Sequence, residues 1–352
     1  MKRAIIILLI TVLLVALAAY ILKPKPPDKP VPEEPAASGV EGQDAPGGGD
    51  AEKSAIEQAA WCVYWDPASA SAAAENLARY RELVLFGCVY DEDHALVVPE
   101  KLTALIEGMP DRSNSERPEL YLSFINDVMH PDGSSTQKST AFLQEVLPDA
   151  ELSEAVIDDM IRQTQAFGFD GIELDYENSE KCDGLMDDYL SFVSRLWQRA
   201  AAENLKLRVV LSVSMPAEAL GSIEGPRYTV MCYNLFGTHS GPGPKADEAF
   251  LKRTVGKFKN LHADYALANG GFEWGPNGKA LRSLTAKAAA ALAAETGADA
   301  TRDGDGAVHF TYQAEDGPHT VWYGDEATIQ RWSEILLEEE DGDIRTDLWR
   351  LE

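Results

Sequence analysis

The residues with the clearest chemical potential form an acidic row in the octapeptide Asp170–Glu177. Carboxylates at Glu173, Asp175 and Glu177 occupy alternate positions, and Ile172 and Leu174 fill positions between them. Because side chains alternate across a β-strand, the three carboxylates would share one face. Such a row is usually the solvated face of a sheet, so the neighbouring segments decide whether it is a surface or a site.

The neighbouring segments favour a buried site. Amphipathic helices are predicted over Leu152–Phe167 and Leu185–Ala202, on either side of the acidic strand. A strand between two helices belongs to a parallel sheet covered on its outer face, so the carboxylates would point into a barrel or crevice. Like charges are costly there unless some hold a proton, and a raised carboxyl pKa is what general-acid catalysis requires.

Alternating strand and helix patterns along the chain predict an α/β fold, a (β/α)8 TIM barrel formed by residues 54–352. A small α+β insertion, about residues 283–340, is expected between strands 7 and 8, with a hairpin between two helices. The eight predicted strands are Trp61–Trp65, Leu83–Val89, Leu120–Ile125, Gly171–Asp175, Leu207–Val213, Thr229–Tyr233, Tyr265–Ala268 and Asp347–Trp349.

Polar or aromatic residues follow most of these strands, where the active site of such a barrel would lie. Any one of them could be an ordinary loop start or helix cap, but their recurrence favours a site. These residues are Asp66, Tyr90, Asp91, Asn126, Asp127, Glu177, Met215, Tyr233, Asn234, Glu273, Trp274 and Trp349.

The N-terminal sequence predicts export. Cationic Met1–Arg3 precedes the apolar stretch Ala4–Leu22, which nearly spans a bilayer core, so residues 1–22 are expected to be a membrane anchor. A cleaved signal peptide, with a small-x-small site at Ala16–Ala18, is the alternative. Residues 23–53 are rich in Pro, Gly, Ala and acids, which is typical of a disordered linker. Either alternative leaves the remaining chain outside the cytoplasm.

Composition narrows the range of partners. With 58 acidic and 31 basic residues, the net charge of -27 argues against nucleic acid or anionic lipid and favours a neutral substrate. The four cysteines lack metal-type spacing. Cys62, Cys88 and Cys232 lie in apolar runs and are expected to be buried thiols, although a Cys62–Cys88 disulfide remains an alternative in an exported protein.

Taken together, these motifs resemble glycoside hydrolase family 18, the chitinase-type barrels, and within it the bacterial cell-wall and spore-cortex N-acetylglucosaminidase branch. The resemblance covers about residues 60–352. Asp170–Glu177 is similar to the family's D-G-x-D-x-D-x-E signature, and Val230–Asn234 to its M-x-Y-D motif. Further similarities to the branch lie in Gly271–Trp274, His319–Ala327 and Leu348–Leu351.

This resemblance implies retaining hydrolysis of an N-acetylglucosamine-containing polysaccharide by a monomer without metal or cofactor. The acetamido oxygen of the substrate would act as the nucleophile, as in substrate-assisted glycosidases. Glu177 would be the general acid and base, Asp175 would orient the acetamido group, and Tyr233 would bind its oxygen. The substrate-binding residues that it implies are Glu173, Asn234, Met231, Trp349, Trp274 and Asn126.

Two residues depart from the family pattern. Glu173 and Asn234 both stand where the family usually has Asp. The first change alters a contact with Asp175, and the second replaces an ionisable acceptor with an amide. These departures keep open the alternative of a non-catalytic chitinase-like glycan-binding protein, and a barrel of another sugar-hydrolase family is a third interpretation.

Overall fold

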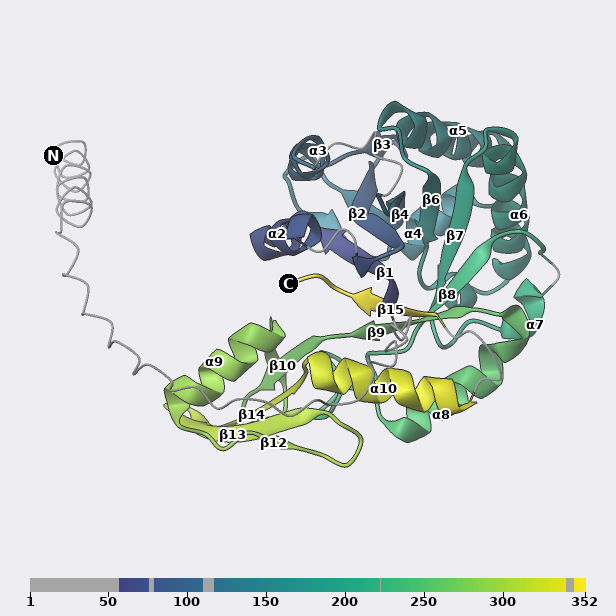
Figure 1. Ribbon diagram of the computed structural model, residues 1–352. Coiled ribbons are helices and arrows are strands. Elements are labelled where there is room, and N and C mark those ends of the chain that lie inside the picture. The colour runs from purple at the N-terminus through teal and green to yellow at the C-terminus, as the bar shows by residue number, and fades with distance from the viewer. Residues whose placement is uncertain (1–56, 76–78, 110–116, 222, 340–344) are drawn as a thin grey trace, which may run out of the picture. The chain divides into compact units, whose positions relative to one another are not determined.

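The computed structural model describes residues 57–352, except 76–78, 110–116, 222 and 340–344 (Figure 1). The predicted anchor or signal peptide (1–22) and linker (23–53) lie outside the described residues. Among the helices that the structure describes, none has the length and apolar character needed to span a membrane.

Eight parallel strands close into a barrel with helices around it, which confirms the predicted (β/α)8 fold (Figure 1). β15 pairs with both β9 and β1, and β2 pairs with β4, so the ring of strands is complete. Around the barrel the strands are β1 (Glu57–Val63), β2 (Glu82–Asp91), β4 (Glu119–Met129), β6 (Gly171–Asp175), β7 (Lys206–Leu211), β8 (Arg227–Met231), β9 (Asp264–Ala268) and β15 (Thr346–Trp349). Two short strands, β3 (Leu96–Val97) and β5 (Ser135–Thr136), pair with the extended ends of β2 and β4.

Helices between the strands form because their apolar residues recur on one face and a polar side chain caps several N-termini. Ser139, Asp149 and Asp247 cap α4, α5 and α8 by accepting backbone N–H groups. The helices outside the insertion are α2 (Pro67–Glu75), α3 (Glu100–Glu107), α4 (Thr140–Val146), α5 (Ala150–Ala166), α6 (Met186–Ala202), α7 (Ala217–Leu220), α8 (Glu248–Phe258) and α10 (Glu326–Glu339), with short 3-10 turns η2 (Ser179–Lys181) and η3 (Lys259–Leu261).

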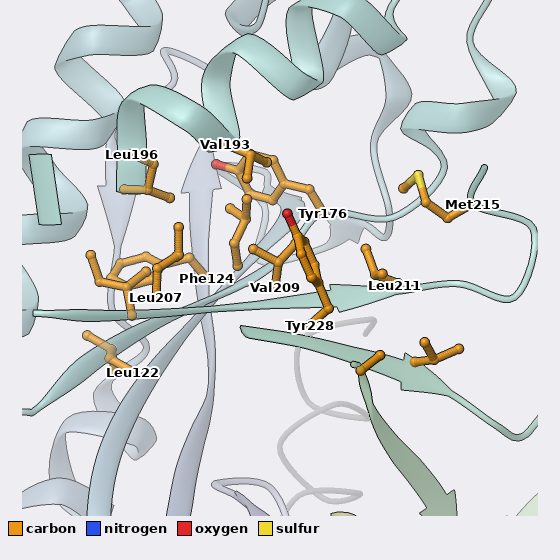
Figure 2. Close-up of a cluster of buried hydrophobic side chains, with 14 of the residues drawn as sticks. Leu122, Phe124, Tyr176, Val193, Leu196, Leu207, Val209, Leu211, Met215 and Tyr228 are labelled. Atoms are coloured by element: carbon orange, nitrogen blue, oxygen red, sulfur yellow. The ribbon is translucent and has the colours of Figure 1, made fainter. Parts of the chain in front are cut away.

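The apolar core lies between the barrel and these helices. Figure 2 shows Val193 and Leu196 of α6 facing Leu207 and Val209 of β7. Ile172 and Leu174 belong to the same buried cluster. Because neighbouring residues on β6 point to opposite faces, Glu173 and Asp175 are directed into the barrel. The alternation that the sequence predicted thus sets the direction of the acidic row.

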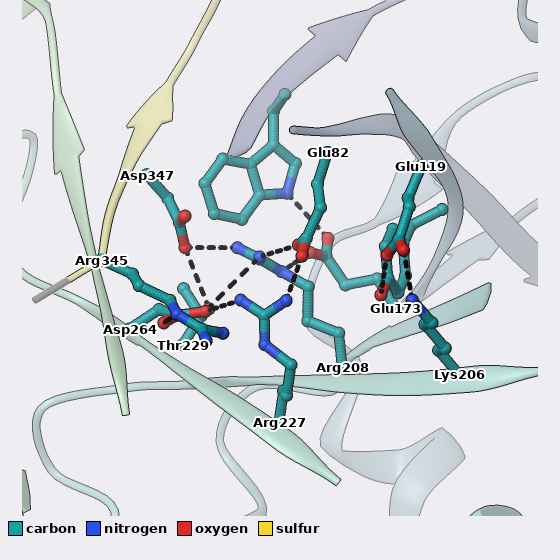
Figure 3. A network of polar contacts seen from close by, with 12 residues as sticks. Glu82, Glu119, Glu173, Lys206, Arg208, Arg227, Thr229, Asp264, Arg345 and Asp347 are labelled. Atoms are coloured by element: carbon teal, nitrogen blue, oxygen red, sulfur yellow. Dashed lines mark hydrogen bonds and ion pairs between the residues drawn. The ribbon is translucent and has the colours of Figure 1, made fainter. Parts of the chain in front are cut away.

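The N-terminal end of the barrel holds a buried network of charges around Arg208 of β7 (Figure 3). Its guanidinium donates from Nε to Glu173 at 2.8 Å and from Nη1 to Glu82 at 3.1 Å, and Nη2 binds Asp347. Arg227 bridges Glu82 to Asp264. Burial raises the pKa of Asp347 to about 7, although Arg208 acts in the opposite direction. The network ties together six strands, β2, β6, β7, β8, β9 and β15.

An antiparallel sheet with one helix is inserted between β9 and β15. Its strand order is β11-β10-β14-β13-β12, and α9 packs against the sheet. Gly271 fits here because a Cβ at this position would lie 1.8 Å from the carbonyl oxygen of Trp322 on the neighbouring strand. The elements are β10 (Gly270–Trp274), β11 (Ala280–Leu284), α9 (Ala286–Thr296), β12 (Thr301–Arg302), β13 (Val308–Ala314) and β14 (Gly317–Gly324).

The bounds of this insertion differ from the predicted 283–340. It begins at Gly270, because a short aromatic segment interpreted as a loop is strand β10. Helix α10 packs against α8 and β9, so it belongs to the barrel wall. An amphipathic pattern does not indicate which surface the helix will cover, and the sequence therefore could not assign it. All four cysteines are free, which excludes the Cys62–Cys88 disulfide in this structure.

We expect Arg208→Met to lower the free energy of unfolding by about 3–5 kcal/mol, because it leaves buried carboxylates without their counterion. Arg253→Met, at an exposed position of α8, should change it by less than about 0.5 kcal/mol. Urea unfolding of both variants measures the difference. Equal stability of the two variants would contradict a structural role for the network.

Candidate active site

A cavity of about 380 Å³ opens at the C-terminal ends of the barrel strands. Its size is that of a small-molecule or sugar site. Six of the nine predicted site residues line it: Asp175, Glu177, Met231, Tyr233, Asn234 and Trp349. The strand ends of β6, β8 and β15 therefore meet at one site, as expected for this fold.

Asp175 is the most deeply buried acid of the cavity. Burial raises its pKa well above the usual range for aspartate, and the charges of Glu177 and Glu173 act in the same direction. Its Oδ1 atom has no hydrogen-bond partner among the described residues. A buried polar atom without a partner is costly, so this oxygen is poised to bind a polar group that enters the cavity.

Glu177 lies two residues beyond Asp175, and its side chain is 18% exposed. Its backbone is held by Asn126, near the C-terminal end of β4. The N–H of Glu177 donates to Asn126 Oδ1 at 2.9 Å, and Asn126 Nδ2 donates to the Glu177 carbonyl at 3.0 Å. Asn126 was predicted to bind substrate, but it is 1% exposed and does not line the cavity. It instead positions Glu177.

Lys138 also contacts Glu177, and nothing in the sequence singled it out. Its Nζ lies 2.6 Å from Glu177 Oε1. The residue belongs to the loop between β5 and α4, has a left-handed backbone with φ of +51°, and lines the cavity. Its backbone N–H donates to Asp127 Oδ1 at 2.7 Å, so the strand end at Asp127 fixes its place. Of Lys138 and Asp127, only Asp127 matches a sequence pattern, because it follows a predicted strand.

Glu173 is not a substrate contact, contrary to the prediction. It is fully buried, and its oxygens accept from Trp61 Nε1 at 2.7 Å and Arg208 Nε at 2.8 Å. Glu173 and Arg208 are register partners on β6 and β7, so their side chains point the same way. The sequence missed this pair because Arg208 lies within a run interpreted as an apolar strand. Glu173 therefore supports the cavity through Trp61, which lines it.

Aromatic side chains form one wall of the cavity. The ring of Trp349 makes edge contacts with Trp61 and Phe86, with centroids 5.8 Å and 4.9 Å apart. Trp65 extends this surface and is 47% exposed. Aromatic faces of this kind suit the apolar C–H faces of sugars.

Trp274 is the third predicted residue that does not line the cavity. It is fully buried, and its indole N–H donates to the carbonyl of Ser240, 3.1 Å away. Phe272 lies on the same face of β10 and lines the cavity in its place. The loop after β8, to which Ser240 belongs, covers Trp274. Phe272 and Trp274 are two residues apart and therefore share one face of the strand. The sequence alone could not show which of them lines the cavity.

Polar side chains also line the cavity. Burial raises the pKa of Tyr233 well above its usual value, so its hydroxyl stays protonated and can donate a hydrogen bond. Burial also lowers the pKa of Lys245 to about 8, and its ammonium donates to the Asn269 carbonyl at 2.7 Å. Asn234 has φ of +65°, a conformation that Asn adopts more readily than most residues.

Solved structures of chitinases and of a cortex-lytic enzyme share this architecture. A chitinase from Chromobacterium violaceum ATCC 12472 aligns with a TM-score of 0.69 and 19% identity over 84% of this chain and 94% of its own. The spore cortex-lytic enzyme SleL of Bacillus cereus aligns with a TM-score of 0.69 and 18% identity over 84% of this chain and 71% of its own. A class V chitinase from Nicotiana tobaccum reaches 0.65 with 12% identity over 83% of this chain and 93% of its own.

At these identities the likeness establishes the barrel fold. No protein-family model and no curated protein matches the sequence.

We expect Asp175→Asn to stabilise the protein, and more so at pH 8 than at pH 5. Because burial raises its pKa, the carboxyl holds its proton more tightly in the folded state than in the unfolded one. Its stability contribution is therefore complete below the unfolded value of about 3.9 and is lost as pH rises toward the folded value. The neutral amide does not titrate, so the variant avoids this loss.

Urea unfolding at the two pH values measures the effect, with Asp93→Asn, an exposed carboxylate, as the control. If Asp175→Asn raises the free energy of unfolding by the same amount at pH 5 and pH 8, burial has little influence on the pKa of the Asp175 carboxyl group.

Proposed function

We propose that the protein is a retaining glycoside hydrolase of the family 18 type, acting on glycans that contain N-acetylglucosamine. The observation that carries the proposal is that Glu177 shares a cavity with Tyr233, Trp349 and a buried Asp175 oxygen that no described residue binds. The chitinase-type fold supports it. A sugar ring stacked on Trp349 would bring its 2-acetamido group toward Asp175 and Tyr233.

In the first step, the acetamido oxygen of the bound sugar attacks its own C1 as the bond from C1 to the glycosidic oxygen breaks. Glu177 gives its proton to that oxygen, which leaves with the rest of the glycan. The sugar is left as a cyclic oxazolinium ion. Tyr233 would bind the acetamido oxygen, and Asp175 would accept a hydrogen bond from the acetamido N–H.

In the second step, the Glu177 carboxylate takes a proton from water as the water oxygen bonds to C1. The oxazolinium ring opens, the acetamido group is restored, and the configuration at C1 is retained. Asp175 stabilises the positive charge in both steps when it is ionised. A hydrogen-bond donor and a developing cation beside this carboxyl both favour its ionised form, which burial opposes in the free protein.

The position of Glu173 supports a nucleophile that comes from the substrate. An ordinary retaining glycosidase uses a second carboxylate about 5–5.5 Å from the acid. Both oxygens of Glu173 are engaged by Trp61 and Arg208 below the cavity, and the side chain is fully buried. It therefore has no access to the anomeric carbon.

We further propose that the catalytic domain acts outside the cytoplasm, where residues 1–22 anchor it to the membrane or have been removed as a signal peptide. An enzyme in that position meets peptidoglycan first, so we rank peptidoglycan ahead of chitin-like glycans. The protein would act as a monomer. Its net charge of -27 argues against binding to nucleic acid, which is also negatively charged.

The second candidate is a glycan-binding protein without hydrolytic activity. The contact of Lys138 with Glu177 favours it, because the ammonium occupies a carboxyl oxygen that a general acid would turn toward the glycosidic oxygen. Release of product from a chromogenic N-acetylglucosaminide or from muropeptides distinguishes the two candidates.

We expect Glu177→Gln to lower the hydrolysis rate by about 10²–10⁴-fold, because the amide keeps the shape of the side chain but has no acidic proton. Glycan binding, measured by calorimetry, should persist. Glu107→Gln, at an exposed position of α3, serves as the control and should hydrolyse at the wild-type rate. Near-normal turnover by the Glu177→Gln protein would remove Glu177 from the acid role.

We expect hydrolysis to require the acetamido group of the substrate. Replacing this group with a hydroxyl should abolish cleavage, and a thiazoline analogue of N-acetylglucosamine should inhibit by mimicking the cyclic intermediate. Inhibition kinetics and a plain glucoside substrate test both points. Efficient glucoside cleavage, or a covalent glycosyl-enzyme trapped with a fluorosugar, would overturn the substrate-assisted mechanism.

A further inference from the structure

Lys138 and Glu177 are held in place by the same strand end. Asp127 binds the backbone N–H of Lys138, and Asn126 binds both backbone groups of Glu177. Ser139, which caps α4, donates its N–H to the Asn126 carbonyl at 2.8 Å, and Asn126 Nδ2 also donates to the Ser139 carbonyl. The lysine and the acid are therefore positioned together.

This arrangement leaves the lysine side chain accessible to ligand. Its side chain is 47% exposed, while that of Glu177 is 18% exposed, and both line the cavity. The ammonium can donate three hydrogen bonds, and the Nζ–Oε1 contact of 2.6 Å with Glu177 is the ion pair that Lys138 makes within the described residues. A ligand can reach Lys138 without displacing buried structure.

The contact opposes catalysis as proposed. A carboxyl group that protonates a glycosidic oxygen has to be neutral and has to face that oxygen. The Lys138 ammonium, 2.6 Å from Oε1, occupies the place where that oxygen would meet the glycosidic oxygen, so productive binding has to move Lys138 away. Sugar hydroxyls offer it only neutral acceptors, whereas a carboxylate offers the opposite full charge that Lys138 gives up when it leaves Glu177.

The place of Glu177 tells where such a carboxylate would lie. Because this acid would protonate the leaving oxygen, its neighbour Lys138 would be within reach of the sugar that leaves. In a 4-linked N-acetylmuramic acid, the lactyl ether is on the carbon adjacent to the one that bears the glycosidic oxygen. Its carboxylate is therefore within a few bonds of the atom that Glu177 protonates. The strongly acidic chain would otherwise repel such a group.

We propose that Lys138 selects glycans whose leaving sugar carries a carboxylate, and that its transfer from Glu177 to this carboxylate frees the acid to act. This inference rests on the proposed function and narrows its substrate class. It assigns Lys138 a role in specificity at the leaving-group side of the cavity.

The test compares two disaccharides in which N-acetylglucosamine is β-1,4-linked to N-acetylmuramic acid, one with the free carboxylate and one with the carboxyl reduced to an alcohol. We expect the full-length protein to cleave the carboxylate form with a kcat/KM about tenfold higher. Lys138→Met should abolish this preference: it should slow the carboxylate form, which loses its charged partner, and speed the reduced form, because Glu177 no longer holds the ammonium. Lys138→Arg should retain part of the preference.

Lys101→Met, at an exposed position of α3, is the matched control and should keep the full preference. Equal slowing of both substrates by Lys138→Met, or an unchanged preference, would overturn the inference and leave the hydrolase proposal intact. If the wild-type protein cleaves neither substrate, the hydrolase proposal fails. The role of Lys138 is then tested by calorimetry of the binding of both disaccharides. Tighter binding of the carboxylate form by the wild type, lost in Lys138→Met, supports this role. Equal binding of the two disaccharides by the wild type refutes it.

Discussion

The rest of the barrel depends on the ion pairs that the buried guanidinium of Arg208 makes with carboxylates of other strands. A charge without solvent has to be matched by carboxylates, and Arg208 takes them from β6, β2 and β15. Each carboxylate can reach Arg208 only if its strand is in the observed register. A shift of the strand by one residue would turn the carboxylate to the apolar outer face of the barrel. The network therefore stabilises one register among several that hydrophobic packing alone would accept.

The same guanidinium connects the floor of the barrel to the candidate site. Glu173 joins Arg208 to the indole of Trp61, and Trp61 contacts the Trp349 ring that lines the cavity. Two carboxylates on one strand thus have different tasks because of what lies next to them. Glu173 has strong partners and is part of the scaffold, whereas Asp175 faces the cavity with one oxygen that no described residue binds.

The sequence predicted what depends on local periodicity and could not predict what depends on register between distant strands. The alternation around Glu173 and Asp175 indicated the barrel and its inward acidic face, and residues at strand ends such as Tyr233 and Asn234 do line the cavity. The pairing of Glu173 with Arg208 required the neighbouring strand, and Lys138 lies on a loop without any pattern. Trp274 was misassigned because a loop covers it, which strand parity does not reveal.

The pairing of β15 with β1 has a consequence for the order of events during synthesis. These strands come from opposite ends of the folded domain, yet they carry Trp349 and Trp61, which share the cavity. Contacts between segments so distant in sequence form late, since the intervening chain has to be ordered first. While β15 is still being translated, the emerging polypeptide holds Glu177, Asp175 and Trp61 but lacks Trp349 and the strand that closes the barrel. The cavity is thus completed only after the whole domain has been translated.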